Sequence, residues 1–154
     1  MRLFIIFLIF SFCCSSQKHI PINDSSVLPF LVMKRTACYG TCPQYMITIY
    51  HHGLVRYEGK MFVDKIGCFE AMLSDELIHD IKLKLYNVNF FEFETEYDSN
   101  ITDVPSTILK IHLDGKTHEV MDRFNGPLEL KGVHVLIDHY VDSIIKWNSC
   151  EILE

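Results

Sequence analysis

Two cysteines separated by three residues are the side chains in this sequence with the clearest chemistry. Cys38 and Cys42 enclose Tyr39-Gly40-Thr41 and are followed by Pro43. A pair at this spacing can form a disulfide, work as a redox couple, or supply two ligands to a metal ion. Thiol oxidoreductases usually place two residues between their cysteines at the start of a helix, whereas Pro43 leads into a strand pattern. The spacing therefore favours a structural disulfide, with thiol-redox chemistry as the alternative.

The sequence offers little support for a metal site. A cysteine pair needs further ligands, and the nearest supply is His51-His52, about 20 Å away along a strand that rises ~3.3 Å per residue. Oxygen-rich residues from Asp98 to Asp103 could hold calcium, but they lack the spacing of an EF-hand, and such residues also cap loops through their own backbone. We therefore predict no metal and no cofactor.

Catalytic motifs are missing from the sequence as well. His134 and Asp138 lie one helical turn apart, a spacing that is typical of a hydrogen bond on a helix surface. The sequence contains no H-E-x-x-H, no G-x-S-x-G, no phosphate-binding loop and no dinucleotide fingerprint. We name no catalytic residue, and the sequence favours a non-enzymatic domain over an enzyme.

The first fourteen residues predict export. Arg2 is followed by a ten-residue stretch, residues 3–12, that is apolar except for Ser11, and then by Cys13-Cys14. This apolar run is shorter than the ~20 residues of a membrane-spanning helix and has the length of a secretory signal. Cysteine at its end is typical of a bacterial lipoprotein, so we predict lipidation at Cys14 (or Cys13) and a flexible tether over residues 15–29. A plain cleaved signal and an uncleaved anchor remain alternatives.

Composition limits the remaining possibilities. The net charge is −6 with acids and bases interspersed, which argues against a nucleic-acid partner. Removing the signal leaves about 140 residues, enough for one domain, which we place at residues 30–150. Cys68 and Cys150 either pair with each other or stay as thiols.

Periodicity predicts an α+β fold. Strand patterns over residues 30–36, 45–50, 54–58 and 66–73 indicate a four-strand meander, and Ser74 caps an amphipathic helix over 74–86. Asp114-Gly115 joins strands 107–113 and 116–122 in a β-hairpin, with Ile111 opposite His118. A C-terminal helix opens near Pro127 and extends to about Trp147. We expect one antiparallel sheet with both helices packed on one face.

The segment from Arg35 to Tyr45 resembles the DUF6438 family of exported bacterial domains, which carries a CxGxCPxY signature. Tyr57-Glu58-Gly59 and Thr102-Asp103-Val104-Pro105 agree with this resemblance, which covers residues 30–147. The resemblance implies a domain of envelope lipoproteins and brings no activity, substrate or cofactor.

These observations favour a binding module displayed on a lipid-anchored tether in the cell envelope, with an unknown envelope protein or ligand as its partner. We select Tyr39, Tyr97, Asp98 and Asp103 as binding residues, because exposed tyrosines favour binding surfaces. Tyr45 and Tyr57 could join Tyr39 and Tyr97 in a cluster near the cysteine loop. The alternatives are an enzyme that uses Cys38 and Cys42, and a structural component of an envelope assembly.

Overall fold

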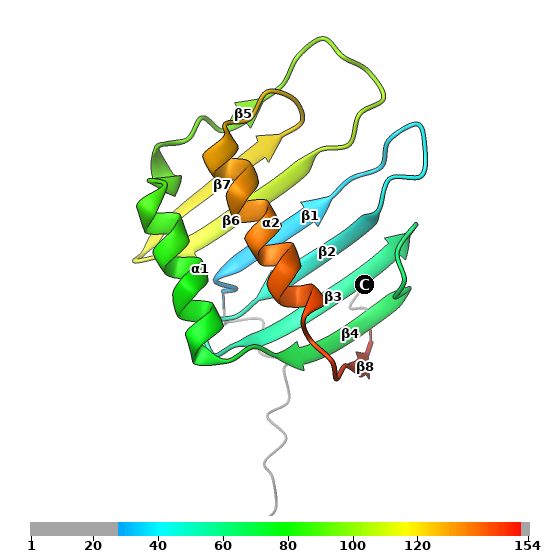
Figure 1. The fold of residues 1–154 in the computed structure, drawn as a ribbon, viewed down its shortest axis with the longest axis vertical. Helices are drawn as coiled ribbons and strands as arrows, with labels where there is room; N and C mark the ends of the chain where they lie inside the picture. Colours follow the sequence, from blue (N-terminus) through cyan, green and yellow to red (C-terminus); the bar gives the residue numbers. More distant parts are fainter. Residues whose placement is uncertain (1–27, 152–154) are drawn as a thin grey trace, which may run out of the picture.

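The computed structural model of the protein describes residues 28–151, which form one eight-stranded sheet and two α-helices (Figure 1). The predicted signal, Cys13, Cys14 and nearly all of the predicted tether lie outside the described residues. The strand order across the sheet is β5-β7-β6-β1-β2-β3-β4-β8. The strands are β1 (Leu31–Arg35), β2 (Gln44–Ile49), β3 (Leu54–Met61), β4 (Gly67–Met72), β5 (Glu96–Tyr97), β6 (Thr107–Leu113), β7 (Lys116–Asp122) and β8 (Asn148–Cys150). The helices are α1 (Asp75–Asn87), the short 3₁₀ helix η1 (Phe90–Glu92) and α2 (Leu128–Asp142).

The predicted meander is confirmed. β1 to β4 pair in sequence order, each antiparallel to the next. Alternation along these strands separates the two faces of the sheet, since successive side chains point to opposite sides. Leu31 and Met33 are fully buried, and the side chain of Arg35 follows them on the same face.

The predicted hairpin and its register are also confirmed. Asp114 and Gly115 both have positive φ angles, 52° and 72°, as a two-residue hairpin turn of the favoured type requires. Ile111 lies opposite His118, and His112 lies opposite Thr117. The inward-facing residues of β6 and β7 are therefore the ones that the alternation pattern selects.

Both helices begin close to the predicted positions, but α2 ends earlier than expected. Ser74 caps α1, and its hydroxyl accepts a hydrogen bond from the Leu77 N–H. The prediction that the last helix extends to Trp147 is wrong, because α2 ends at Asp142. The chain then turns back, the Trp147 indole donates to the Ile144 carbonyl at 3.1 Å, and the following residues form β8.

The prediction of a purely antiparallel sheet is wrong at one edge. β5 pairs with the end of β7 in parallel, through Glu96 opposite Met121 and Tyr97 opposite Asp122. At the other edge, β8 adds an antiparallel strand beside β4 that the sequence did not predict. Both extra strands are two or three residues long, so they carry no alternation that a sequence pattern could reveal.

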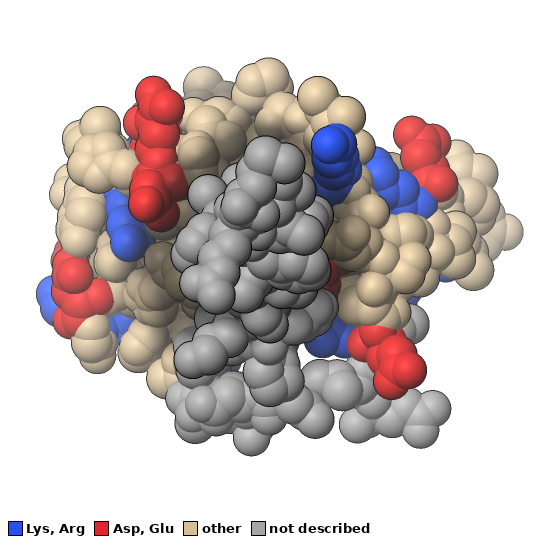
Figure 2. Space-filling model, turned by 90° about the horizontal axis from the view of Figure 1, so that it is seen from below, with Lys and Arg blue, Asp and Glu red and all other residues tan. Residues whose placement is uncertain are grey.

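In Figure 1 the two helices lie over the same face of the sheet. The core is one cluster of buried side chains from β1–β3, β6, β7, α1, η1 and α2. No helix among residues 28–151 is long and apolar enough to span a membrane. Figure 2 views the molecule from below, and acidic and basic side chains are mixed on the described surface seen there.

Candidate functional site

Four connections of the chain gather at one end of the sheet, which we call the loop end. They are the β1–β2 loop, the β3–β4 turn, the β5–β6 loop and the β7–α2 loop, along the upper and right-hand sides of Figure 1. Cys38 and Cys42 are joined by a disulfide within the β1–β2 loop, with their Cα atoms 5.8 Å apart. The predicted brace therefore shapes a loop that has three other connections as neighbours.

The β1–β2 and β5–β6 loops are hydrogen-bonded to each other. The Thr36 N–H donates to the Ser106 carbonyl at 3.0 Å, and the Ser106 N–H donates to the Thr36 hydroxyl at 2.8 Å. Farther out, the Tyr39 N–H donates to the Asp103 carbonyl at 3.4 Å. The fold thus brings together two of the predicted binding residues, and the Tyr39 side chain is 90% exposed beside the disulfide.

The other two predicted binding residues lie at the start of the β5–β6 loop. The Tyr97 side chain is half-buried against the core, its ring meets Phe93 edge-on, and its hydroxyl accepts the Glu94 N–H at 3.1 Å. Asp98 pairs with Arg123 at 3.5 Å and also accepts the Ser99 N–H. These contacts give Tyr97 a packing role and fix Asp98 at the base of the loop.

Tyr45 and Tyr57 stack on each other with ring centroids 5.5 Å apart. Neither Tyr39 nor Tyr97 is in contact with this pair among the aromatic contacts of the described residues. Only half of the suggested tyrosine cluster therefore forms, and it forms beneath α2.

A polar network ties α2 to the sheet below the disulfide loop. Asp138 accepts the Tyr45 hydroxyl on Oδ1 and the Arg35 guanidinium on Oδ2, each at 2.6 Å. Arg35 also donates to the Thr107 hydroxyl at 2.6 Å. This network therefore joins three strands and a helix, and its partners lie up to 103 positions apart along the chain.

The surroundings of Tyr45 in this network keep its hydroxyl protonated. Burial, together with the hydrogen bond to Asp138, raises the pKa of Tyr45 well above its ordinary value. The phenol keeps its proton and stays a donor, and both carboxylate oxygens of Asp138 are already occupied.

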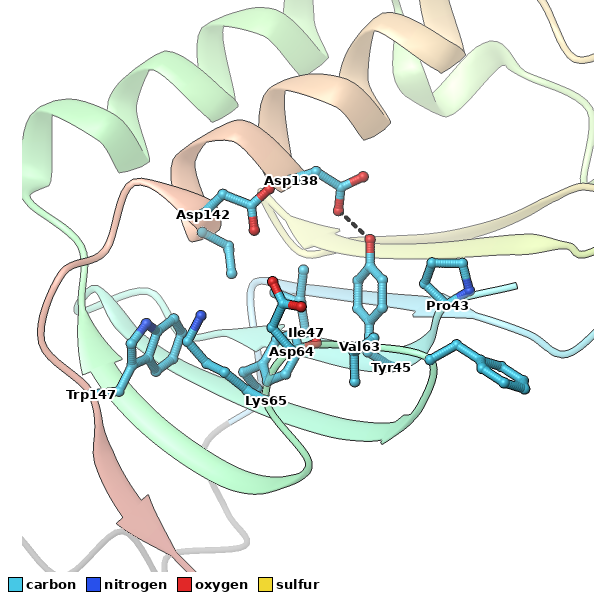
Figure 3. Close-up of a pocket in the computed structure, with 12 residues that line it drawn as sticks. Pro43, Tyr45, Ile47, Val63, Asp64, Lys65, Asp138, Asp142 and Trp147 are labelled. Atoms are coloured by element: carbon cyan, nitrogen blue, oxygen red, sulfur yellow. Dashed lines mark hydrogen bonds between the residues drawn. The ribbon is translucent and has the colours of Figure 1, made fainter. Parts of the chain in front are cut away.

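A cavity of about 320 Å³ lies between α2, β2, β3 and the β3–β4 turn. Figure 3 shows Asp138 and Asp142 extending into it from α2, and Asp64 extending toward them from the turn. Its walls include Tyr45, Tyr57 and Trp147, so we call it the acidic-aromatic cavity. A Cβ atom on Gly59 would collide with the Lys65 carbonyl, so glycine lets the turn approach β3 closely.

A second cavity of about 380 Å³ lies beside Arg35, between the β7–α2 loop and α2. Arg35, Arg123 and Lys131 give it basic walls, and the buried Asp122 and His134 also line it. Burial, together with the positive charges of Arg35 and Lys131, lowers the pKa of His134 to about 3. The nearest carboxylate oxygen, on Asp122, is 3.9 Å from Nδ1, beyond hydrogen-bond distance, so the imidazole is neutral.

The cysteine loop and Tyr45, which belong to the same sequence motif, are thus connected in the folded chain. A comparison of the sequence with known protein families identifies the family. Residues 29–141 match the family described as "Domain of unknown function (DUF6438)". The chain belongs to the DUF6438 family. None of the curated proteins compared with the chain matches it.

The signature of this DUF6438 domain now has a structural explanation at both ends. Its cysteines brace the loop, and its final tyrosine, Tyr45, donates to Asp138. Tyr57 forms the stacking partner of Tyr45 on the adjacent strand. Trp147 and Cys150 lie beyond the matched residues, so part of the cavity wall and the second disulfide come from the C-terminal segment of this chain.

Sequence reasoning missed Arg35 and misjudged Asp138. The predicted surface hydrogen bond between His134 and Asp138 is wrong: His134 is buried, and Asp138 faces Arg35 and Tyr45. A signal for Arg35 was present, because it lies two residues after Met33 and four after Leu31 on the inward face of β1. A charged residue in that register predicts a buried partner, but its identity needed the folded structure.

Cys68 and Cys150, which the sequence left undecided, form a second disulfide between β4 and β8. On the same face of the sheet, Arg56 is buried between Glu58 and Glu70 and also donates to the Glu151 carbonyl. Among residues 28–151 no group of three His, Cys, Asp or Glu side chains is placed to hold a metal ion.

Proposed function

We propose that this DUF6438 domain is a non-enzymatic binding module of the cell envelope, which presents its loop end to a protein partner or ligand. The observation that carries this proposal is the joining of the disulfide loop to the β5–β6 loop, with Tyr39 exposed at their junction. The disulfide and the hydrogen bonds at Thr36 and Asp103 hold this surface in one arrangement before any partner arrives. Such preorganisation lowers the entropic cost of binding.

The chemistry of the exposed residues supports the same function. A tyrosine side chain offers a large contact area with only two rotatable bonds, and tyrosine is enriched at protein interfaces. Tyr39 is 90% exposed, although an aromatic side chain on a rigid loop gains nothing for the isolated fold from that position. Its ring is therefore available for contact with a partner.

Site-specific photocrosslinking tests this proposal. A photoreactive phenylalanine analogue in place of Tyr39 should give a discrete crosslinked product in intact envelopes. Tyr86 is the matched control, since it is an exposed tyrosine, at 51%, on α1 and away from the loops. Equal crosslinking at the two positions, or none at Tyr39, would contradict the proposal.

Asp103→Asn provides a second variant. Asp103 has a φ of 68°, a left-handed conformation that asparagine adopts as readily as aspartate, so the backbone bond to Tyr39 should persist. We expect this variant to keep its folded stability and to lose part of the Tyr39 crosslink if the carboxylate contacts the partner.

The location outside the cytosol is the other half of the proposal. It is supported by the signal-like residues 1–14 and by two disulfides, which persist in oxidising compartments. Intact mass analysis of the mature protein should find a chain that begins at an acylated Cys14 (or Cys13) and carries two disulfides. A mature chain that retains residues 1–12 with reduced cysteines would contradict this location.

A further inference from the structure

The acidic-aromatic cavity has three aromatic rings in a row along one wall. Tyr45 stacks on Tyr57 at 5.5 Å, and Tyr57 lies 6.0 Å from Trp147. The rings come from β2, β3 and the segment after α2, so the folded chain assembles a continuous aromatic wall. The face of an aromatic ring carries partial negative charge and attracts cations.

Carboxylates lie opposite this wall. Asp138 and Asp142 extend into the cavity from α2, and Asp64 extends from the β3–β4 turn, as Figure 3 shows. Asp138 is neutralised by Arg35 at 2.6 Å. Among the described residues, Asp64 and Asp142 have no ion-pair partner within 4.0 Å. Two carboxylates therefore remain to compensate a positive charge in the cavity.

The three carboxylates act together on the middle ring. Burial raises the pKa of Tyr57, and Asp142, Asp64 and Asp138 add to the rise by opposing a negative charge on the phenol, so that the pKa is about 12. The three carboxylates therefore all make the electrostatic potential at the Tyr57 ring, the middle ring of the aromatic wall, more negative.

The protein already places one cation of its own in this cavity. The Lys65 ammonium lies over the Trp147 ring, 5.8 Å from its centroid. This distance is within the ~6 Å over which a cation–π interaction operates. Lys65 follows Asp64 on the β3–β4 turn and is attached by a flexible chain, so its ammonium can give way to another cation.

From these contacts we propose that the acidic-aromatic cavity binds a small organic cation with an alkylated ammonium group, which displaces Lys65 from Trp147. A volume of about 320 Å³ accommodates a molecule of this size. Aromatic rings and carboxylates on opposite sides suit a soft, weakly hydrated ammonium, whereas a metal ion requires converging oxygen or nitrogen ligands. Neither Tyr39 nor Asp103 lines this cavity, so this inference does not depend on the proposed function.

The chain provides its own reporter for this site. Trp147 is the single tryptophan of the sequence, so tryptophan fluorescence observes this cavity alone. Titration of the folded protein with choline should change the fluorescence and saturate. The neutral isostere 3,3-dimethylbutan-1-ol has the same shape without the charge, and we expect it to bind at least about ten-fold more weakly, which corresponds to ~1.4 kcal/mol.

Two groups of variants sharpen the test. Asp64→Asn with Asp142→Asn removes the uncompensated charge at two exposed positions, so the fold should persist while choline binding weakens about ten-fold. Lys65→Met removes the competing cation and should strengthen choline binding several-fold. Lys116→Met is the matched control, because Lys116 lies over the Phe91 ring at 5.9 Å, outside the cavity, and should leave the affinity unchanged.

Each outcome decides the proposal. Saturable choline binding that weakens in the double variant and strengthens in Lys65→Met supports it. An equal response to choline and its neutral isostere, no saturable response, or equal effects of Lys65→Met and Lys116→Met would overturn it. The Tyr39 crosslink serves as an independent measurement, since it should survive Asp64→Asn with Asp142→Asn.

Discussion

Two regions of this domain each combine a disulfide with an arginine that is paired to carboxylates, but the two combinations have different roles. At the loop end, the Cys38–Cys42 disulfide lies near Arg35, which pairs with Asp138. At the β4–β8 edge, the Cys68–Cys150 disulfide shares a sheet face with Arg56, which pairs with Glu58 and Glu70. The first disulfide spans 4 positions of the chain and the second spans 82.

The two regions differ in how far the arginine side chain is exposed to solvent. The Arg35 side chain is 27% exposed and lines the second cavity. The Arg56 side chain is 10% exposed, forms ion pairs with Glu58 and Glu70, and donates a hydrogen bond to the Glu151 carbonyl. A disulfide between residues close in sequence fixes the shape of a loop but restricts the unfolded chain little. A disulfide between residues far apart in sequence restricts the unfolded chain more and so stabilises the folded state more. We therefore assign shape to the loop end and stability to the edge.

The largest effect should come from the long disulfide. In the chain-entropy description, a bond that closes a loop of about 80 residues stabilises a protein by about 4 kcal/mol. Replacing both Cys68 and Cys150 with alanine should lower the free energy of unfolding by about that amount. Urea denaturation of the variant beside the parent protein measures the difference.

The outcome also tests whether β8 belongs to the cooperative unit. A loss below about 1 kcal/mol with an unchanged slope against urea would mean that β8 separates from β4 before the rest of the domain unfolds. In that case the long disulfide would not stabilise the core, and the contrast between the two regions would fail.

The sequence predicted the first disulfide and not the second, and the reason is chain distance. Cys38 and Cys42 lie within one turn-forming segment, so local spacing is sufficient. Cys68 meets Cys150 only because β8 pairs with β4 in one register, and a strand of three residues has no pattern of its own. The short parallel strand β5 was missed for the same reason.

The candidate site divides in the same way. The strand pattern over residues 45–50 predicted the strand that carries Tyr45, and the cysteine motif located the loop. The contact of Tyr45 with Asp138 joins positions 93 residues apart, through packing of α2 on the sheet. No local pattern specifies that contact, so the network and both cavities required the structure.

Replacing each arginine in turn sharpens the comparison. Arg56→Met should cost about 3 kcal/mol, because it leaves two carboxylates in a buried site without their cation. Arg35→Met should cost about half as much, since solvent reaches its partly exposed pair with Asp138 and screens the lost charge. The free energies of unfolding in urea give both values, and the assignment fails if their order is reversed.

An exposed ion pair provides the reference for these values. Lys110 and Glu119 are 3.5 Å apart with side chains 51% and 55% exposed. Glu119→Ala should change the stability by less than about 0.5 kcal/mol, as is usual for surface pairs. A larger change would show that charge removal itself, rather than burial, sets the cost.

Mild acid should affect the loop end through His134, the one histidine buried among the described residues. Its pKa is about 3 in the folded protein and near 6.5 in the unfolded chain, so the unfolded state takes up the proton first as the pH falls. This contribution to stability is complete above pH ~6.5 and is lost progressively as the pH falls toward ~3, by about 2 kcal/mol at pH ~5.

Urea denaturation at pH 7.5 and at pH 5 measures this effect. His134→Leu keeps an apolar group in the buried site and should make the stability less dependent on pH over that interval. If the parent and the variant lose the same stability between the two pH values, the titrating group is another residue.

The short disulfide should give a smaller loss of stability than the long one, together with a clear loss of local order. Replacing Cys38 and Cys42 with alanine removes the cross-link that closes a loop of five residues. In the chain-entropy description this lowers the free energy of unfolding by about 2 kcal/mol or less. The backbone hydrogen bond from Tyr39 to Asp103 depends on the shape of that loop, so the yield of the Tyr39 crosslink should fall by a larger factor than the free energy of unfolding.

Hydrogen exchange of the Tyr39 amide offers a direct measurement, and we expect faster exchange there than in the parent protein. Exchange at the Thr36 amide, which is bonded to Ser106 at the base of the loop, is the internal control and should change little. Should both amides lose protection together, the disulfide supports the whole loop end, and its role would resemble that of Cys68–Cys150 after all.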